Sequence, residues 1–264
     1  MRKSLISLLF IFIFSGISSG QEDFKVIKVN GSIVLKTNNV SLQTGTVFSE
    51  KETLVFRTDD ATAAVINAQK GRMILTSKNH DLSAAQTNYL PAMYNISTRG
   101  GPLANLIALQ NHFSGKYVVL DRQEIVMDEE NFPMGKDSFF FLRYTYKVEE
   151  INKKLEYSGD TLIIDKKSLY SIDAKPIPRP DNTLIKLFYR SADQSVMINE
   201  FNLIFPDTKQ LKEEVKIIID TMKDRSNKEQ VGEINAYIYD LYGKVYQPNL
   251  LSWLDKNFGL EIIR

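Results

Sequence analysis

The 264-residue sequence contains no cysteine, only two histidines and almost no excess of either charge. Without cysteine the chain cannot form disulfides, use a thiol nucleophile or hold an iron–sulfur cluster. Two histidines cannot supply the three imidazoles of a His-only catalytic zinc site. A net charge of +1 gives no overall attraction to nucleic acid. We therefore expect no cofactor, no bound metal and no nucleic-acid partner.

Long hydrophobic runs are also scarce, and the clearest one lies at the N-terminus. Arg2 and Lys3 precede an apolar run from Leu5 to Phe14. Ser18 and Gly20 then take the −3 and −1 positions of a cleavage site. A charged start, an apolar run and small residues are the layout of a secretory signal peptide.

Residues 1–20 are therefore interpreted as a cleaved signal peptide. The alternative is a membrane anchor, but the apolar run is shorter than the roughly 20 residues that span a bilayer. No cysteine follows the run, so a lipid anchor of the bacterial lipoprotein type is excluded. Cleavage removes two positive charges and leaves a net charge of −1. We expect a periplasmic or outer-membrane-associated protein with no membrane span after cleavage.

Residues 21–77 have the pattern of a small β domain. Two β-branched runs, 24–29 and 32–35, flank Asn30-Gly31, which predicts a tight hairpin or a single strand with a bulge at Gly31. Further strands are expected at 40–42, 46–48, 53–57, 61–67 and 72–76. Many short strands separated by turn residues favour a small sandwich or barrel.

The apolar and glycine positions of this region resemble the FecR-like β domain of exported bacterial proteins and iron-uptake regulators. The positions that carry the resemblance are Val29, Gly31, Val34, Leu42, Gly45, Phe48, Leu54, Ala61, Ala63, Val65, Gly71 and Leu75. Regulators of that family also carry a segment that binds a sigma factor and a membrane helix, and this chain has neither. The resemblance implies a bacterial envelope module that contacts other proteins.

The rest of the chain divides into three parts. Residues 78–116 are rich in turn residues and are interpreted as a connector with one short helix inside 103–113. Residues 117–206 predict a second β-rich domain. Residues 207–264 predict three helices, with Asp207 as the first cap. The expected class is α+β: a small N-terminal β sandwich or barrel, a second β-rich domain and a C-terminal three-helix segment.

Strand patterns in the second β region include an aromatic run and a proline-rich stretch. Residues 139–142 are apolar at every position, which indicates a central strand covered on both faces. Prolines at 176, 178 and 180 predict an extended loop or edge segment, because proline cannot donate to a β ladder.

One loop suggests a small-ligand site. Amides near two glycines can form an anion-binding nest, and an arginine beside them adds positive charge. The loop consists of Ser97, Thr98, Arg99, Gly100 and Gly101. It lacks the features of a P-loop or a dinucleotide fingerprint, so the alternatives are an exported small-anion sensor and a plain turn.

Acidic and histidine residues offer weaker candidates. Glu149, Glu150 and Asp160 are the acids that a carboxylate-based hydrolase of envelope glycan would use. His80 and His112 lie 32 positions apart and do not form a metal motif. The acidic residues at 128–131 lack the spacing of a calcium loop and predict a solvated turn.

Aromatic residues gather in the C-terminal segment. Tyr239, Tyr242, Tyr246 and Trp253 are candidates for a protein interface, and core packing is the alternative. Helical spacing places Tyr239 and Tyr242 on one face and directs Tyr237 elsewhere. With no catalytic constellation in view, the expected function is non-enzymatic: an interaction or scaffold component of an envelope assembly, bound to other envelope proteins.

Overall fold

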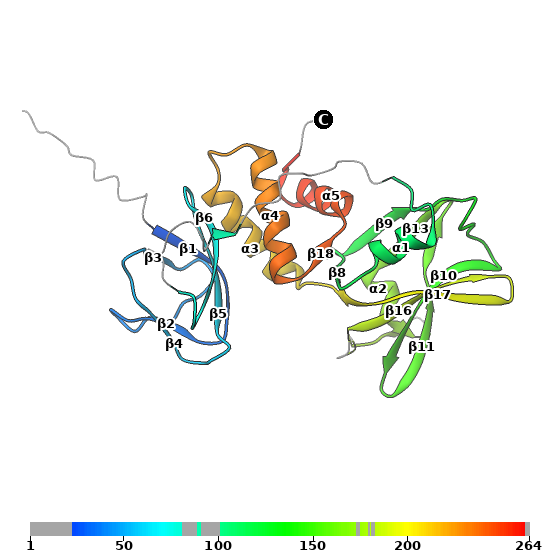
Figure 1. Cartoon of the computed structure of the whole chain (residues 1–264), viewed down its shortest axis with the longest axis horizontal. Helices are drawn as coiled ribbons and strands as arrows, with labels where there is room; N and C mark the ends of the chain where they lie inside the picture. Colours follow the sequence, from blue (N-terminus) through cyan, green and yellow to red (C-terminus); the bar gives the residue numbers. More distant parts are fainter. Residues whose placement is uncertain are drawn as a thin grey trace, which may run out of the picture.

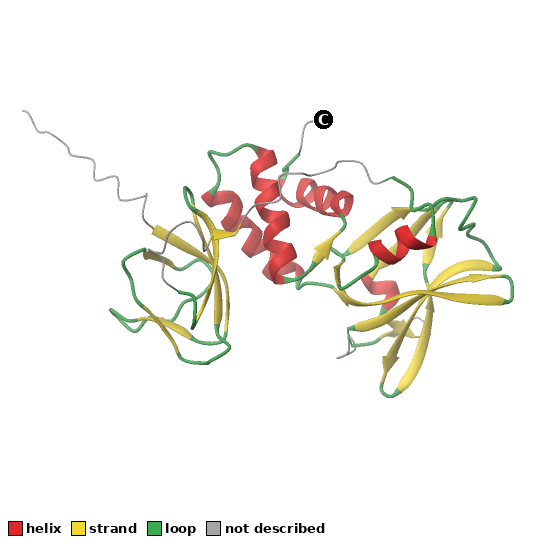
Figure 2. Cartoon of the chain, viewed as in Figure 1, coloured by secondary structure: helices red, strands yellow, loops and turns green. Residues whose placement is uncertain are grey.

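The computed structural model describes residues 23–80, 89–90, 101–172, 175–178, 180 and 183–261. A small β body contains the N-terminal strands. The three C-terminal helices lie beside it, and a larger β body lies on the other side of these helices (Figure 1). Two short helices belong to the larger β body (Figure 2). The α+β class expected from the sequence is confirmed.

The small β body contains a five-stranded sheet and a two-stranded sheet. The strands are β1 (Asp23–Asn30), β2 (Ile33–Leu35), β3 (Val47–Ser49), β4 (Leu54–Phe56), β5 (Thr62–Asn67), β6 (Gly71–Thr76) and β7 (Tyr89–Leu90). The five-stranded sheet has the order β3-β1-β5-β6-β7, and β2 pairs with β4. Alternate residues of β5 face opposite sides: Ala63 and Val65 enter the core of this body, whereas Ala64 and Ile66 join a second core.

The predicted hairpin at Asn30-Gly31 is wrong. β1 pairs with β3 and β5, and β2 pairs with β4 in a separate sheet, so the chain passes from one sheet to another at this point. Gly31 adopts φ +74° there, and a Cβ atom would come within 2.9 Å of Ala61. The glycine therefore permits a sharp corner and a close backbone approach. The strand expected at 40–42 is also wrong, since this segment forms only a bridge between Ser41 and Val34.

The larger β body encloses its core between a six-stranded and a three-stranded sheet. Its strands are β8 (Lys116–Val118), β9 (Arg122–Val126), β10 (Ser138–Tyr146), β11 (Glu149–Lys154), β12 (Glu156–Ser158), β13 (Thr161–Asp165), β14 (Ser171–Ile172), β15 (Lys175–Pro176), β16 (Leu184–Ser191), β17 (Gln194–Ile204) and β18 (Lys244–Val245). The orders are β11-β10-β16-β17-β8-β18 and β12-β13-β9, and β14 pairs with β15.

The larger β body also contains two short helices. Helix α1 (Leu106–His112) confirms the short helix predicted inside 103–113, and Asn105 caps it by accepting a hydrogen bond from Ala108 N. Helix α2 (Lys166–Leu169) directly follows strand β13. Asp165 accepts hydrogen bonds from Lys167 N and Ser168 N, so a cap converts the strand end into a helical turn.

The three C-terminal helices are α3 (Thr208–Thr221), α4 (Asn227–Leu241) and α5 (Gln247–Phe258). The Asp207 cap is confirmed, because its side chain accepts from Gln210 N. Ser226 and Glu229 form a reciprocal capping box at the start of α4. Gly259 ends α5 in the left-handed conformation. No helix in the described part of the chain has both the length and the apolar character to cross a bilayer.

One hydrophobic core runs through the helices and reaches both β bodies. It combines apolar side chains of all three helices with Ile27, Ala64 and Ile66 of the small body and Val118 and Leu120 of the larger one. The short strand β18, between α4 and α5, also pairs in parallel with β8. The helices therefore join the two β bodies through shared burial and strand pairing.

Candidate functional site

The six-stranded sheet has one face in the core of the larger β body; its other face joins the core of the helices at β8 and β18 but not at β10 and β16. In β10, Phe140, Leu142 and Tyr144 are buried in the core. Side chains alternate along a strand, so Phe139, Phe141 and Arg143 point to the opposite face. The predicted central strand is confirmed as an inner strand, but its outer face is covered by charged side chains and not by a second layer.

Strand register brings aromatic and sulfur-containing side chains into one row on this outer face. Phe141 lies opposite Lys154 of β11 and opposite Phe188 of β16. Phe188 in turn lies opposite Met197 of β17. Residues directly opposite each other in antiparallel strands share a face and touch. The rings of Phe141 and Phe188 stack with 4.9 Å between centroids and 6° between planes.

Cationic side chains lie over two of the aromatic rings on this outer face, those of Phe139 and Phe188. The Lys154 ammonium is 4.1 Å from the Phe139 centroid, and the Arg143 guanidinium is 4.7 Å from the Phe188 centroid. The Arg190 guanidinium lies 5.9 Å from the Phe139 centroid. Such contacts hold a cation in place while one side of it stays in water. We call this surface the cation–aromatic face; it comprises Phe139, Phe141, Arg143, Lys154, Lys186, Phe188, Arg190 and Met197.

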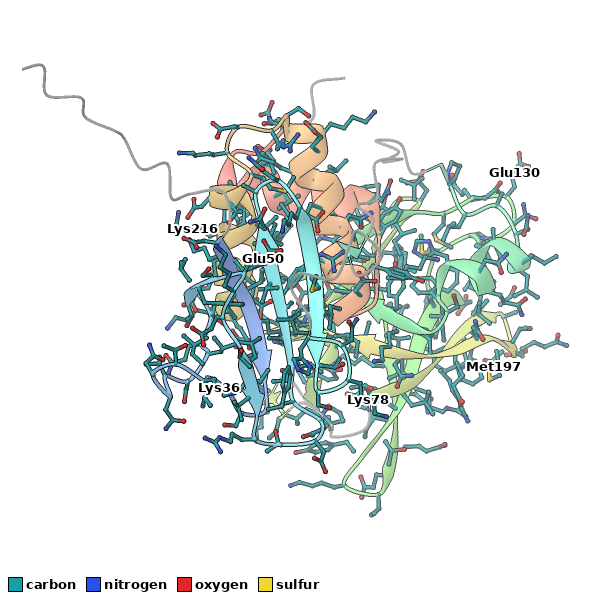
Figure 3. The ribbon with its side chains drawn as sticks, turned by 60° about the vertical axis from the view of Figure 1, so that its left-hand side comes forward. Lys36, Glu50, Lys78, Glu130, Met197 and Lys216 are labelled. Atoms are coloured by element: carbon teal, nitrogen blue, oxygen red, sulfur yellow. The ribbon has the colours of Figure 1, made fainter. Side chains whose placement is uncertain are left out.

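Positive charge exceeds negative charge on the cation–aromatic face. Lys186 pairs with Glu200 at 3.5 Å, and Arg143 lies 3.9 Å from Glu150. Lys154 and Arg190 instead donate to backbone carbonyls, at 3.3 and 2.9 Å, and neither has a carboxylate partner among the described residues. Met197 is 49% exposed beside these charges and lies at the rim of the molecule (Figure 3). The face thus presents fixed cations next to exposed apolar surface.

A buried polar cluster lies on the other side of the same sheet. The Tyr117 hydroxyl is 2.5 Å from His112 Nε2 and accepts a hydrogen bond from the Gln123 amide. Burial, with a smaller contribution from the nearby Lys244 charge, lowers the pKa of His112 to about 4. Lys244 donates to the backbone carbonyl of His112, so this cluster connects α1 with β18. The Gln123 side-chain oxygen is buried without a hydrogen-bond partner among the described residues, so the polar groups of this cluster are only partly satisfied.

Neither histidine takes part in a metal site among the described residues. No group of three or more metal-ligating side chains occurs in that part of the chain. The His80 ring packs on the Phe56 ring, with 5.2 Å between the ring centroids. In the acidic turn, Asp128 accepts hydrogen bonds from the amides of Glu130 and Asn131, as a solvated turn requires.

The candidate hydrolase acids do not share a sheet. Glu149 and Glu150 are exposed on β11, in the six-stranded sheet. Asp160 lies in the turn before β13, in the three-stranded sheet, and accepts from the Thr161 hydroxyl. None of the three acids lines the pocket that residues of α3, α5 and β9 form.

Three of the four candidate interface aromatics make contacts within the protein. The Tyr242 hydroxyl donates to Glu214 and accepts from Lys28, and its ring contacts Tyr237 at 6.3 Å. Tyr246 contacts His112, and Trp253 contacts Phe258. Tyr239 is 51% exposed. The expectation that Tyr237 points away from Tyr242 is therefore wrong.

The candidate anion loop is described at one of its five positions. Its residues Ser97, Thr98, Arg99 and Gly100 lie outside the described residues. Gly101 is described and exposed, and a Cβ atom there would have no neighbour within 4 Å.

Comparison with known proteins gives no relative of this chain. No protein-family model, no curated protein and no solved structure matches it. The geometry of the candidate site is therefore what indicates its function. Sequence reasoning missed the cation–aromatic face, although two segments carry its signal: Phe139, Phe141 and Arg143 recur at every second position, as do Lys186, Phe188 and Arg190. Strand pairing then places these two sets side by side.

Proposed function

We propose that this chain is an exported, non-enzymatic binding protein of a bacterial envelope that holds an acidic segment of another envelope protein on the cation–aromatic face. The observation that carries the proposal is the set of cations packed on the Phe139 and Phe188 rings. Lys154 and Arg190 face solvent without a carboxylate partner, so an incoming carboxylate would complete their pairing.

The arrangement suits a protein partner better than a partner that offers negative charge alone. Met197 adds exposed apolar area beside the cations, and arginine and aromatic side chains are the groups that contribute most to protein interfaces. The rings are already covered by cations, so an incoming flat base would have to displace them before stacking. An acidic polypeptide with one or more apolar side chains satisfies both features at once.

The leader-like first 20 residues support the export part of the proposal. The resemblance of residues 24–77 to the FecR-like β domain supports the envelope part. Within the proposal, the small β body and the helices serve as a rigid support for the larger body.

A titration with a defined acidic chain tests the binding part. Poly-glutamate should bind the purified protein and poly-lysine should not. The double variant Lys154→Ser, Arg190→Ser should weaken poly-glutamate binding by about tenfold, because two exposed charges contribute roughly 1.4 kcal/mol together. The matched control Lys36→Ser, Lys78→Ser removes two exposed lysines of the small β body (Figure 3) and should leave binding unchanged. Equal losses in both double variants would contradict the proposal.

A further inference from the structure

A second surface, separate from the cation–aromatic face, forms a pocket of about 480 Å³. One side of α5 makes its floor, the start of β9 and the preceding turn make one wall, and α3 contributes a lysine. The lining comprises Leu120, Asp121, Arg122, Glu124, Lys212, Pro248, Asn249, Ser252, Trp253, Lys256 and Asn257. Its volume lies within the roughly 300–1,000 Å³ that small-molecule sites occupy.

Two cations in this pocket have no ion-pair partner in the described part of the chain. Lys212 and Lys256 are exposed, and neither lies within ion-pair distance of a described carboxylate. Arg122 differs, since its guanidinium pairs with Glu124 at 3.1 Å. The Asp121 carboxylate accepts a hydrogen bond from Thr208 at 2.7 Å. Three cations against two carboxylates leave the pocket with a surplus of positive charge.

The polar side of the pocket is held rigid before any ligand arrives. The Asn249 side chain accepts from Leu120 N at 3.0 Å and donates to the carbonyl of Arg122 at 2.8 Å. These bonds fasten α5 to the strand that forms the opposite wall. The Asn257 amide nitrogen donates to the Trp253 carbonyl at 2.7 Å, which leaves its side-chain oxygen as an acceptor. A pre-organised wall lowers the entropy cost of binding.

We infer that this pocket binds a small acidic carbohydrate, that is, a sugar that carries a carboxylate. Lys212 and Lys256 would hold the carboxylate. Ser252 and Asn257 offer a hydroxyl and an amide oxygen that match sugar hydroxyls. Pro248 and the small exposed part of Trp253, which is 5% exposed, provide a limited apolar surface for the C–H groups of the ring. An entirely apolar ligand would leave these polar groups unpaired, and a bare inorganic anion would use only the lysines.

The inference does not depend on the proposed protein-binding function. The pocket is lined by α3, α5 and β9, whereas the cation–aromatic face lies on β10, β11, β16 and β17. No residue belongs to both surfaces. Either one can therefore be removed by substitution while the other stays intact.

Isothermal titration of the purified protein with glucuronate tests this inference, with glucose and inorganic phosphate as the comparison ligands. Glucuronate should bind at least about tenfold more tightly than either, because a charge-assisted contact and the hydroxyl contacts then act together. Lys212→Gln and Lys256→Gln should each weaken glucuronate binding by about fivefold or more. Both lysines are exposed, so each variant should keep the melting temperature of the wild type.

Two control variants show whether a loss of glucuronate binding is specific to this pocket. Lys36→Gln removes an exposed lysine of the small β body and should leave glucuronate binding unchanged, as should the double variant Lys154→Ser, Arg190→Ser. Absence of glucuronate binding would overturn the inference. Equal affinity for glucuronate and glucose would overturn it too, and so would binding of phosphate as tight as that of glucuronate, since the carbohydrate contacts would then contribute nothing.

Discussion

The Arg72 guanidinium donates from Nε to Glu233 Oε1 over 2.6 Å, and this buried contact ties strand β6 to helix α4. The two residues lie 161 positions apart. A second carboxylate, that of Asp240, lies 2.9 Å from the same guanidinium. Burial raises the pKa of Glu233, although the Arg72 charge opposes that rise. The pair therefore helps to decide how the small β body sits on the helices.

Removal of one member of this pair should be much more harmful than removal of both. Arg72→Met leaves Glu233 buried without its partner, so we expect a loss of about 3–5 kcal/mol in the free energy of unfolding. The double variant Arg72→Met, Glu233→Met should recover a large part of that loss, because no uncompensated carboxylate remains at position 233. Urea denaturation of the three proteins measures both changes.

A double variant no more stable than Arg72→Met would contradict this account of the pair. The exposed pair Lys216–Asp220, on the outer side of α3, serves as the control. Its removal should cost less than about 1 kcal/mol.

Gly243 controls the junction between α4 and the six-stranded sheet. Its φ is +129°, and a Cβ atom there would lie 2.4 Å from the Lys116 carbonyl oxygen. Gly243→Ala should therefore push β18 away from β8 and destabilise the protein by about 2–4 kcal/mol. Gly259→Ala is the matched control: it also has a positive φ, but its Cβ would have open space. We expect a loss of about 1 kcal/mol from that strain alone. If thermal unfolding showed equal losses of stability in the two variants, the contact with Lys116 would be unimportant.

His112 should make the protein less stable as the pH falls below about 6.5. In the unfolded chain the imidazole takes up a proton near its ordinary pKa of 6.5, whereas in the folded protein its pKa is lowered to about 4. The unfolded state therefore binds more protons between these values, and stability falls as pH falls through this window. The expected loss between pH 6.5 and pH 4 is about 2–3 kcal/mol.

The variant His112→Gln removes this titration. Buried carboxyls such as Glu233 also respond to pH. The informative quantity is therefore the difference in the free energy of unfolding between wild type and variant. That difference should shrink steadily as the pH falls from 6.5 to 4. A difference that stays constant across this range, in denaturant unfolding at several pH values, would rule out the role of His112.

Local signals in the sequence predicted many of the secondary-structure elements. Asp207 caps α3, and the short helix α1 lies inside the predicted range 103–113. Each of these depends on contacts within a few residues. The polar strand β11, with sequence EEINKK, was not predicted, because an exposed edge strand needs no apolar alternation.

Long-range pairing explains what the sequence did not reveal. The Asn30-Gly31 pair has the composition of a hairpin turn, yet β1 finds its partners in β3 and β5. In the same way, the cation–aromatic face exists only because Phe141 and Phe188, 47 positions apart along the chain, lie opposite each other in the sheet. The register that joins them is set by the whole core of the larger β body.

Cross-linking in intact cells tests the central claim most directly. A photoreactive amino acid in place of the exposed Met197 should form a discrete adduct, and the cross-linked partner peptide should come from an acidic segment of an envelope protein. The adduct should fall by about tenfold when Lys154→Ser and Arg190→Ser are added. The same photoreactive group at Lys36 should give no such adduct. An adduct that forms equally at both positions, or one that survives the loss of both cations, would contradict the proposal that the cation–aromatic face is the binding surface.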